Sequence, residues 1–149
     1  MALRETGADG LPQWHDESVP YLQLGRIDLQ LSNGKLSSII TCQNDVQFGL
    51  CYSEELPPLE LGPTEAGSIF RNRELEELPI GKVDSVSVSF DRSGDISDVE
   101  IQIGEHSVSL KAGEFYEQWD GSLELLTMDE SILVQVDGER PNKRMIRAR

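Results

Sequence analysis

Apolar and polar residues alternate along most of the chain between residues 82 and 137. In residues 86–90, two valines and a phenylalanine alternate with serines, and similar runs follow at residues 99–103, 108–112 and 132–136. A period of two residues is the signature of a β-strand with one buried face. Sequences rich in Gly, Asp and Ser separate the runs, as turns require. The pattern predicts an antiparallel sheet of short strands joined by hairpins.

Residues 26–52 repeat part of this pattern. Ile27 precedes Val86 by 59 positions, and Gly34 precedes Gly94 by 60. The offset changes only inside turns, where insertions are tolerated. Any two alternating hairpins align to some degree, but here the glycine and serine positions match as well as the apolar ones. We therefore predict an all-β, mainly antiparallel fold in which two similar three-stranded meanders form a β-sandwich or a partly open barrel.

Less regular segments flank and divide the predicted β domain, which spans residues 21–138. Residues 1–20 are polar and predict an N-terminal arm, and residues 139–149 form a basic C-terminal tail. Residues 53–81 form a long acidic connection in which paired prolines exclude a central strand. Connections of this kind often hold binding residues, so this segment is a candidate contact surface.

A short helix over residues 70–78 is one prediction for this connection. Asn72 would cap its N-terminus, and glutamates follow in the first turns, where the helix dipole favours negative charge. Leu75 and Leu78 would then face the sheet, and Pro79 would end the helix.

The acidity of the chain narrows its choice of partners. The 149 residues carry a formal net charge of −14. Five of the 13 basic residues lie in residues 140–149, which leaves eight against all 27 acidic residues and a net charge of −19 for residues 1–139. Such a body repels nucleic acids and anionic membranes, and it attracts basic proteins. We therefore expect a basic protein as partner and neither nucleic acid nor membrane, although acidity that serves solubility alone is common.

Cys42 and Cys51 are the only cysteines. If residues 44–45 form a two-residue hairpin turn, Cys42 faces Gln47 and the two cysteines lie four residues apart, roughly 13 Å along a strand. That separation excludes a disulfide, and we expect two free thiols in a reducing compartment. The chain has no long apolar run, and residues 1–13 lack the apolar centre of a signal peptide. A cytoplasmic location is therefore expected.

Sequence signals for catalysis are weak. The common metal-binding, nucleotide-binding and nucleophile motifs are missing, so we predict a non-enzymatic protein with no cofactor and no metal. His106 would act with Cys42 as a nucleophilic pair only through a tertiary contact. The spacing of Asp91, Asp95 and Asp98 does not match a calcium-binding loop, because the glycine between them stands fourth rather than sixth.

Residues 114–120 mix aromatic side chains with carboxylates. Tyr and Trp beside acidic groups suit a surface that meets Arg or Lys side chains. The alternative is that Phe115 and Trp119 pack in the core while the glutamates are solvated. The candidate partner-binding residues are Glu74, Glu76 and Glu77 in the connection, and Glu114, Tyr116, Glu117 and Asp120 in the second meander. Weaker candidates are Asp91, Asp95 and Asp98.

In size, acidity and lack of catalytic motifs, the chain resembles the small acidic immunity proteins, or antitoxins, of bacterial polymorphic-toxin systems. The resemblance implies a protein that inhibits a toxin such as a nuclease by occupying its basic active-site cleft, because a nuclease must expose positive charge to bind phosphates. A second interpretation is a structural or assembly module that self-associates through its sheet. A third is a β-barrel that binds a small ligand in its lumen, or an enzyme of unrecognised type.

Overall fold

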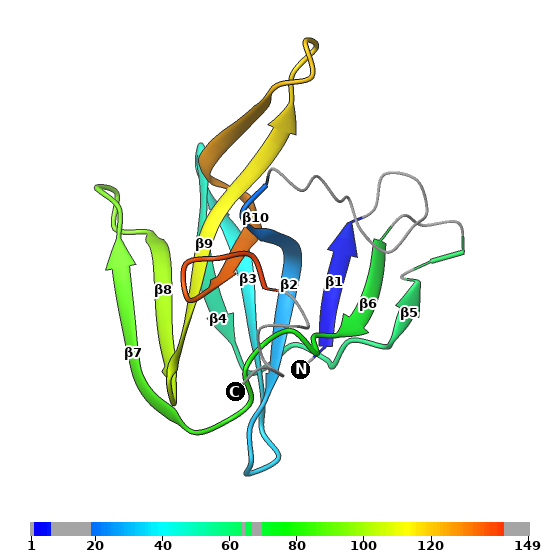
Figure 1. Ribbon diagram of the computed structural model, residues 1–149, viewed down its shortest axis with the longest axis vertical. Helices are drawn as coiled ribbons and strands as arrows, with labels where there is room; N and C mark the ends of the chain where they lie inside the picture. The colour runs from blue at the N-terminus through cyan, green and yellow to red at the C-terminus, as the bar shows by residue number, and fades with distance from the viewer. Residues whose placement is uncertain (1, 7–18, 64, 67–69, 142–149) are drawn as a thin grey trace.

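The computed structural model describes residues 2–6, 19–63, 65–66 and 70–141, and every regular element within them is a β-strand (Figure 1). In chain order the strands are β1 (Ala2–Thr6), β2 (Leu22–Gln30), β3 (Leu36–Asn44), β4 (Gln47–Ser53), β5 (Gly62–Pro63), β6 (Phe70–Glu74), β7 (Val83–Phe90), β8 (Ile96–Ile103), β9 (His106–Glu117) and β10 (Leu123–Val136). Most of the predicted N-terminal arm and of the basic C-terminal tail lies outside the described residues.

Six of the strands close a β-barrel. Their order is β10-β9-β8-β4-β3-β2, and β2 returns to β10 through the antiparallel pairing of Leu24 with Ile132 and of Leu22 with Val134. Every pairing in the sheet is antiparallel. The predicted all-β antiparallel class is confirmed. Of the two predicted architectures the barrel is the one that forms, and it is closed rather than partly open (Figure 1).

The shortest strand pairing in the barrel is the one between β4 and β8. A single residue pair, Leu50 with Ile96, joins these strands. Gly49 permits the approach, because a Cβ atom added there would lie 2.9 Å from the Cβ of Asp95 and 3.3 Å from the backbone oxygen of Ile96. Glycine usually weakens a strand. Here it marks the place where two backbones must come close together.

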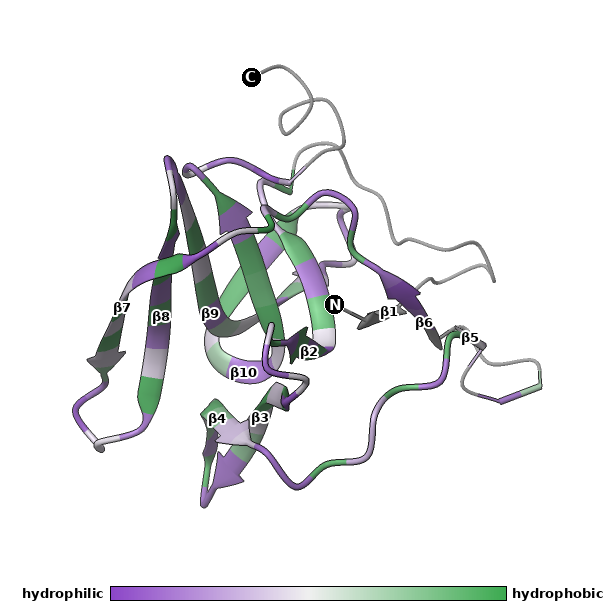
Figure 2. Cartoon of the chain, turned by 90° about the horizontal axis from the view of Figure 1, so that it is seen from below, coloured by the Kyte–Doolittle hydropathy of each residue, from purple (hydrophilic) through white to green (hydrophobic). Residues whose placement is uncertain are grey.

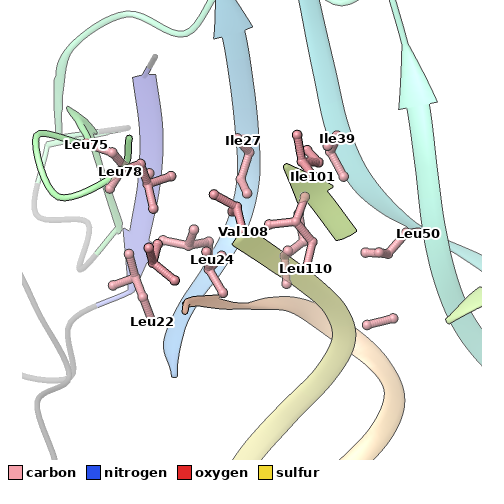
Figure 3. Packing of buried hydrophobic residues seen from close by; sticks show 14 residues of the cluster. Leu22, Leu24, Ile27, Ile39, Leu50, Leu75, Leu78, Ile101, Val108 and Leu110 are labelled. Carbon is pink, nitrogen blue, oxygen red and sulfur yellow. The ribbon is translucent and has the colours of Figure 1, made fainter. Parts of the chain in front are cut away.

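Apolar side chains fill the interior of the barrel. Seen from one end, the strands show hydrophobic and hydrophilic residues in alternation, and the inward-pointing side chains meet in one cluster (Figures 2 and 3). Leu24, Ile132 and Val134 lie at its centre and are 0% exposed. Leu75 and Leu78, from the turn after β6, complete the cluster.

Strands β1, β6 and β5 extend the sheet outward from β2. The first residues of the predicted arm form β1, which pairs with both β2 and β6. The predicted helix over residues 70–78 is wrong, because its first half is strand β6 and a turn follows. The reason is tertiary: β6 pairs with β1, which lies some seventy residues earlier in the sequence, and such pairing overrides a local helical signal. Leu75 and Leu78 are buried as predicted.

The two predicted meanders are present as β2–β3–β4 and β7–β8–β9, but β7 lies outside the barrel. It pairs only with β8 among the described strands. Val86, Val88 and Phe90 are 55%, 43% and 62% exposed. The prediction that this alternating run has a buried face is therefore wrong: the run forms a strand, but no described element packs on its apolar side.

The prediction of free thiols is also wrong, because Cys42 and Cys51 form a disulfide with their Cα atoms 5.9 Å apart. Asn44 pairs with Gln47, so the turn of this hairpin lies one residue later than expected and Cys42 faces Gly49. That shift makes the two cysteines diagonal neighbours on one face of the sheet, within disulfide reach.

Replacing both cysteines with serine is expected to lower the free energy of unfolding by about 2–3 kcal/mol, because the bond closes a short loop and restricts the unfolded chain. The loop spans a sequence separation of nine residues. Urea unfolding of the wild type with and without a reductant measures the effect. The double serine variant is the control, since a reductant must not change its stability further. Equal stability of the oxidised and reduced wild type would contradict the expectation.

A buried ion pair ties the connection between β4 and β5 to the outside of the barrel. Arg26 and Asp28 flank the core residue Ile27 and so point to the opposite face of β2. The guanidinium Nε of Arg26 donates to Asp28 Oδ1 at 2.6 Å, and Asp28 is 1% exposed. Asp28 Oδ2 also accepts the backbone N–H of Leu59 at 3.2 Å, while Arg26 Nη2 donates to the carbonyl oxygen of Pro57 at 2.6 Å. The connection therefore covers these charges and is fixed by them.

Candidate functional site

The hairpin of β9 and β10 projects from the barrel as a freestanding ribbon (Figure 1). Strand β9 pairs with β8 only as far as Lys111, and β10 pairs with β2 only from Ile132 to Val134. Between these points, residues 113–127 pair only with one another. We call residues 113–130 the acidic ribbon, because they include six acidic residues and no basic one.

Two features shape the base of the acidic ribbon. One is the close approach of β10 to Gly113 on β9, and the other is an irregularity in the pairing of these two strands. A Cβ atom added at Gly113 would lie 2.8 Å from the backbone oxygen of Leu126, so only glycine permits β10 to cross so near. The pairing register of β10 then shifts between Thr127 and Ile132. Met128, inside this irregular segment, has a left-handed φ of 58°. The extra residues form a bulge that turns the following carboxylates back toward β9.

This bulge gathers like charges around Glu114. The hydroxyl of Tyr116 donates to Asp129 Oδ2 at 3.3 Å. Desolvation raises the pKa of Glu114 above its ordinary value, and the negative charges of Glu130 and Asp129 raise it further. The buried Oε2 atom of Glu114 has no hydrogen-bond partner among the described residues. Desolvation and the same acidic groups raise the pKa of Tyr116 to about 12.

A cationic group supplied from outside would relieve this arrangement. Carboxylates held near one another with unused acceptor capacity favour a positively charged donor. Arg or Lys side chains of a partner meet this requirement and can also pack on the ring of Tyr116.

The tip of the acidic ribbon is exposed and aromatic. Trp119 is 98% exposed, so the alternative that it packs in the core is wrong. Asp120 organises the turn: its Oδ1 accepts the hydroxyl of Ser122 at 2.6 Å and the backbone N–H of Ser122 at 2.9 Å, and these bonds lower the pKa of Asp120. Phe115 behaves differently, since it is half-buried with its ring 5.8 Å from that of Tyr21.

The glutamates predicted in the connection lie elsewhere. Figure 1 places the turn after β6 at the opposite end of the barrel from the ribbon tip. Glu77 is only 5% exposed and forms an ion pair with Arg73, whose Nη1 donates to Glu77 Oε2 at 2.8 Å. Glu74 and Glu76 are exposed. The structure therefore does not join the two predicted sets of contact residues, and Glu77 offers little surface to a partner.

The weaker acidic candidates serve the contact between two hairpins. Gln47 Nε2 donates to Asp91 Oδ2 at 2.6 Å and to Asp95 Oδ2 at 2.7 Å, and the first of these bonds lowers the pKa of Asp91. Asp98 forms an ion pair with Lys111 at 3.5 Å. These carboxylates thus have partners within the fold, in contrast to the buried Oε2 atom of Glu114.

The conceivable nucleophilic pair does not form. Cys42 is bonded to Cys51, and His106 Nδ1 lies 2.8 Å from Asp137 Oδ2. Within the described ranges, no group of three or more His, Cys, Asp and Glu side chains has an arrangement that could hold a metal ion. The same part of the chain contains no helix long and apolar enough to cross a membrane.

Asp129 and Glu130 were missing from the predicted site. The signal that could have found them is the break in alternation at residues 127–131, where Thr-Met-Asp-Glu-Ser interrupts an otherwise regular strand. An interruption of this kind often marks a bulge, and bulges redirect side chains. The sequence alone does not show that these carboxylates return to Glu114.

Replacing Glu114 with glutamine is expected to stabilise the protein at neutral pH. The folded state raises the pKa of Glu114, so its ionised form is penalised by folding and the wild type gains stability as the pH falls through that raised value. The advantage of the glutamine variant should therefore be present at pH 7 and vanish below about pH 4, where the carboxyl is protonated in both states.

Thermal or urea unfolding of the two proteins between pH 3.5 and pH 8 measures this effect. Glu117→Gln, three residues further along β9 where the side chain is exposed, is the matched control for the loss of one charge. A stability difference between wild type and Glu114→Gln that does not change with pH would contradict the expectation.

Comparison of the chain with protein-family models, with curated proteins and with solved structures finds no match.

Proposed function

We propose that this protein is a non-enzymatic binding protein that neutralises a basic partner protein by engaging it with the acidic ribbon. The observation that supports the proposal is the composition of the ribbon, six acidic residues and no basic one on a hairpin that projects from a closed barrel. Its exposed Trp119 supplies the kind of aromatic anchor that dominates protein interfaces. The charges would speed association and orient the partner.

The partner that fits best is a toxin domain with a basic cleft, such as a nuclease. A nuclease must attract phosphates, so its active site concentrates Arg and Lys side chains. A narrow projecting hairpin can enter a concave surface, as long recognition loops do. The protein would then act as an immunity protein that competes with nucleic acid for the cleft.

The disulfide changes the compartment in which we expect the protein to act. The cytoplasmic location expected from free thiols loses that support, because Cys42 and Cys51 are bonded and disulfides persist mainly in oxidising compartments. We propose that the protein is oxidised where it meets its partner. Alkylation of free thiols in intact host cells tests this proposal. Complete labelling of both cysteines would contradict it and would favour a cytoplasmic location instead.

Co-expression with the product of the neighbouring upstream gene tests the function. The neighbour alone should stop growth, and the pair should grow and form a complex. Lysine at Glu117, Glu124 and Glu130 should weaken that complex about tenfold to a hundredfold, since like charges now face each other. Lysine at Glu55, Glu60 and Glu139 changes the net charge equally on exposed sites outside the ribbon and is the matched control. A complex that survives the ribbon variant, or a harmless neighbour that forms none, would overturn the proposal.

We do not propose a ligand site in the barrel lumen, because the apolar side chains of the core cluster pack there. Self-association through the sheet has a specific structural basis in β7.

A further inference from the structure

Strand β7 presents an unprotected edge. It is the outermost strand on its side of the barrel, and no described strand pairs with its outer edge (Figure 1). Val83, Val86, Val88 and Phe90 form an exposed apolar stripe along it. Soluble proteins usually protect such an edge with charged residues, proline or a covering segment. Residues 85–90 contain only serine, valine and phenylalanine.

The internal repeat indicates what the edge lacks. In the first meander the corresponding strand is β2, since Ile27 is the counterpart of Val86. Both edges of β2 are paired, one with β3 and the other with β10 and β1. The same edge of β7 has no strand beside it within the described ranges. A strand from outside this barrel would complete the second meander as β10 and β1 complete the first.

A second copy of β7 fits this edge in one register. A twofold axis through an antiparallel pair makes the contacts reciprocal. Centred on Val88, the pairing sets Val86 opposite Phe90 of the second copy, with Val88 opposite itself, so apolar residues meet on one face.

The other registers match fewer apolar residues. Asp84 lies in a bulge of β7 between Val83 and Ser85, and its Oδ2 accepts the backbone N–H of Gly104 at 3.0 Å. Moving the centre to Ser87 would set Phe90 opposite this bulged, charged residue, and only Val86 and Val88 would then meet. The register centred on Val88 is the one that sets all three apolar residues of the strand against apolar partners.

We propose that two copies of this protein associate through β7, antiparallel and centred on Val88, so that the two barrels share one continuous sheet. The dimer presents two acidic ribbons, and binding of a partner with two basic sites would gain from that bivalence. The association itself uses no residue of the ribbon. It therefore stands or falls separately from the proposed function.

Single cysteines report the register directly. Directly opposite residues have Cβ atoms about 4.5–5.5 Å apart, so Val88→Cys should link to its own copy under mild oxidation. Val86→Cys is the matched control, because its two copies lie four residues apart along the strands, roughly 13 Å. Non-reducing electrophoresis should show a covalent dimer for the first variant alone. Equal linking of both, or preferential linking through Val86→Cys, would overturn this register.

Sedimentation of the full chain over a concentration series tests the association. Val88→Lys sets two lysines against each other at the axis and should weaken the dimer at least about tenfold. Ser85→Lys adds the same charge on the opposite face of β7, where its two copies lie six residues apart along the strands, roughly 20 Å, and should leave dimerisation unchanged. A wild type that stays monomeric at every concentration would overturn the proposal, as would equal weakening by both variants. The ribbon variant with three lysines should still dimerise, whatever its effect on the basic partner.

Discussion

Replacing Asp28 with alanine is expected to lower the free energy of unfolding by about 3–5 kcal/mol, because removing one member of a buried ion pair leaves the other charged and desolvated. The side chains of Arg26 and Asp28 are only 14% and 2% exposed. Ser38 adds to the loss, since its hydroxyl donates to Asp28 Oδ1 at 2.8 Å and accepts from Arg26 Nη2 at 3.1 Å. The Arg26 Nε–H, the Ser38 hydroxyl and the backbone N–H of Leu59 would all lose their acceptor at once.

The expected loss has a local signature beside the global one. Asp28 also accepts the backbone N–H of Leu59, so the connection between β4 and β5 should exchange its amide hydrogens faster in the variant. Urea unfolding measures the stability, and hydrogen exchange measures the local release. Asp98→Ala is the matched control, because the pair of Asp98 with Lys111 is 38% and 43% exposed and such surface pairs contribute less than about 1 kcal/mol. Similar losses in the two variants would contradict the buried network.

Replacing Ile132 with alanine is expected to cost about 2–5 kcal/mol, through lost burial of apolar surface and the cavity left behind. Ile132 is 0% exposed and pairs with both Ala112 on β9 and Leu24 on β2. The site cannot collapse easily, since each neighbour is fixed in a paired strand. The truncation therefore weakens the place where the barrel closes.

Denaturant unfolding of Ile132→Ala and of Ile132→Val measures this cost, and the valine variant should lose only about 0.5–1.5 kcal/mol. Leu126→Ala is the matched control on the same strand, because Leu126 is 42% exposed in the acidic ribbon and truncation there should change stability by less than about 1 kcal/mol. Equal losses of stability in Ile132→Ala and Leu126→Ala would contradict the expectation that Ile132 lies in the core.

The strands could be predicted from the sequence to the extent that their pairing is local. Alternation and turn residues locate both meanders, because hairpin neighbours are close in the sequence. Strand β6 shows the limit, since its partner β1 lies some seventy residues earlier and the local residues favour a helix instead. The alternation in β7 predicts a half-buried strand, but a period of two residues indicates only that the strand has one apolar and one polar face. Whether another element covers the apolar face is decided by tertiary structure.

The candidate site was predictable in part for the same reason. Glu114, Tyr116, Glu117 and Asp120 are consecutive enough that one hairpin holds them all. Asp129 and Glu130 reach Glu114 only because a bulge changes the register of β10. Glu77 shows the opposite case, in which a charge that looks available along the sequence is used inside the fold by Arg73.

The closure of the barrel through β2 and β10 has a consequence for how the protein is made. Leu24 meets Ile132, so the Leu22–Leu24 end of β2 cannot pair with β10 until 108 further residues (132 − 24) are made, although β1 can already fill the rest of this edge. At about 5–20 residues per second, ribosomes need roughly 5–20 s to supply them. During that interval the edge of β2 that closes the barrel is only partly paired. Chaperones that shield β-strand edges should therefore matter more to the yield of this protein than its final stability would suggest.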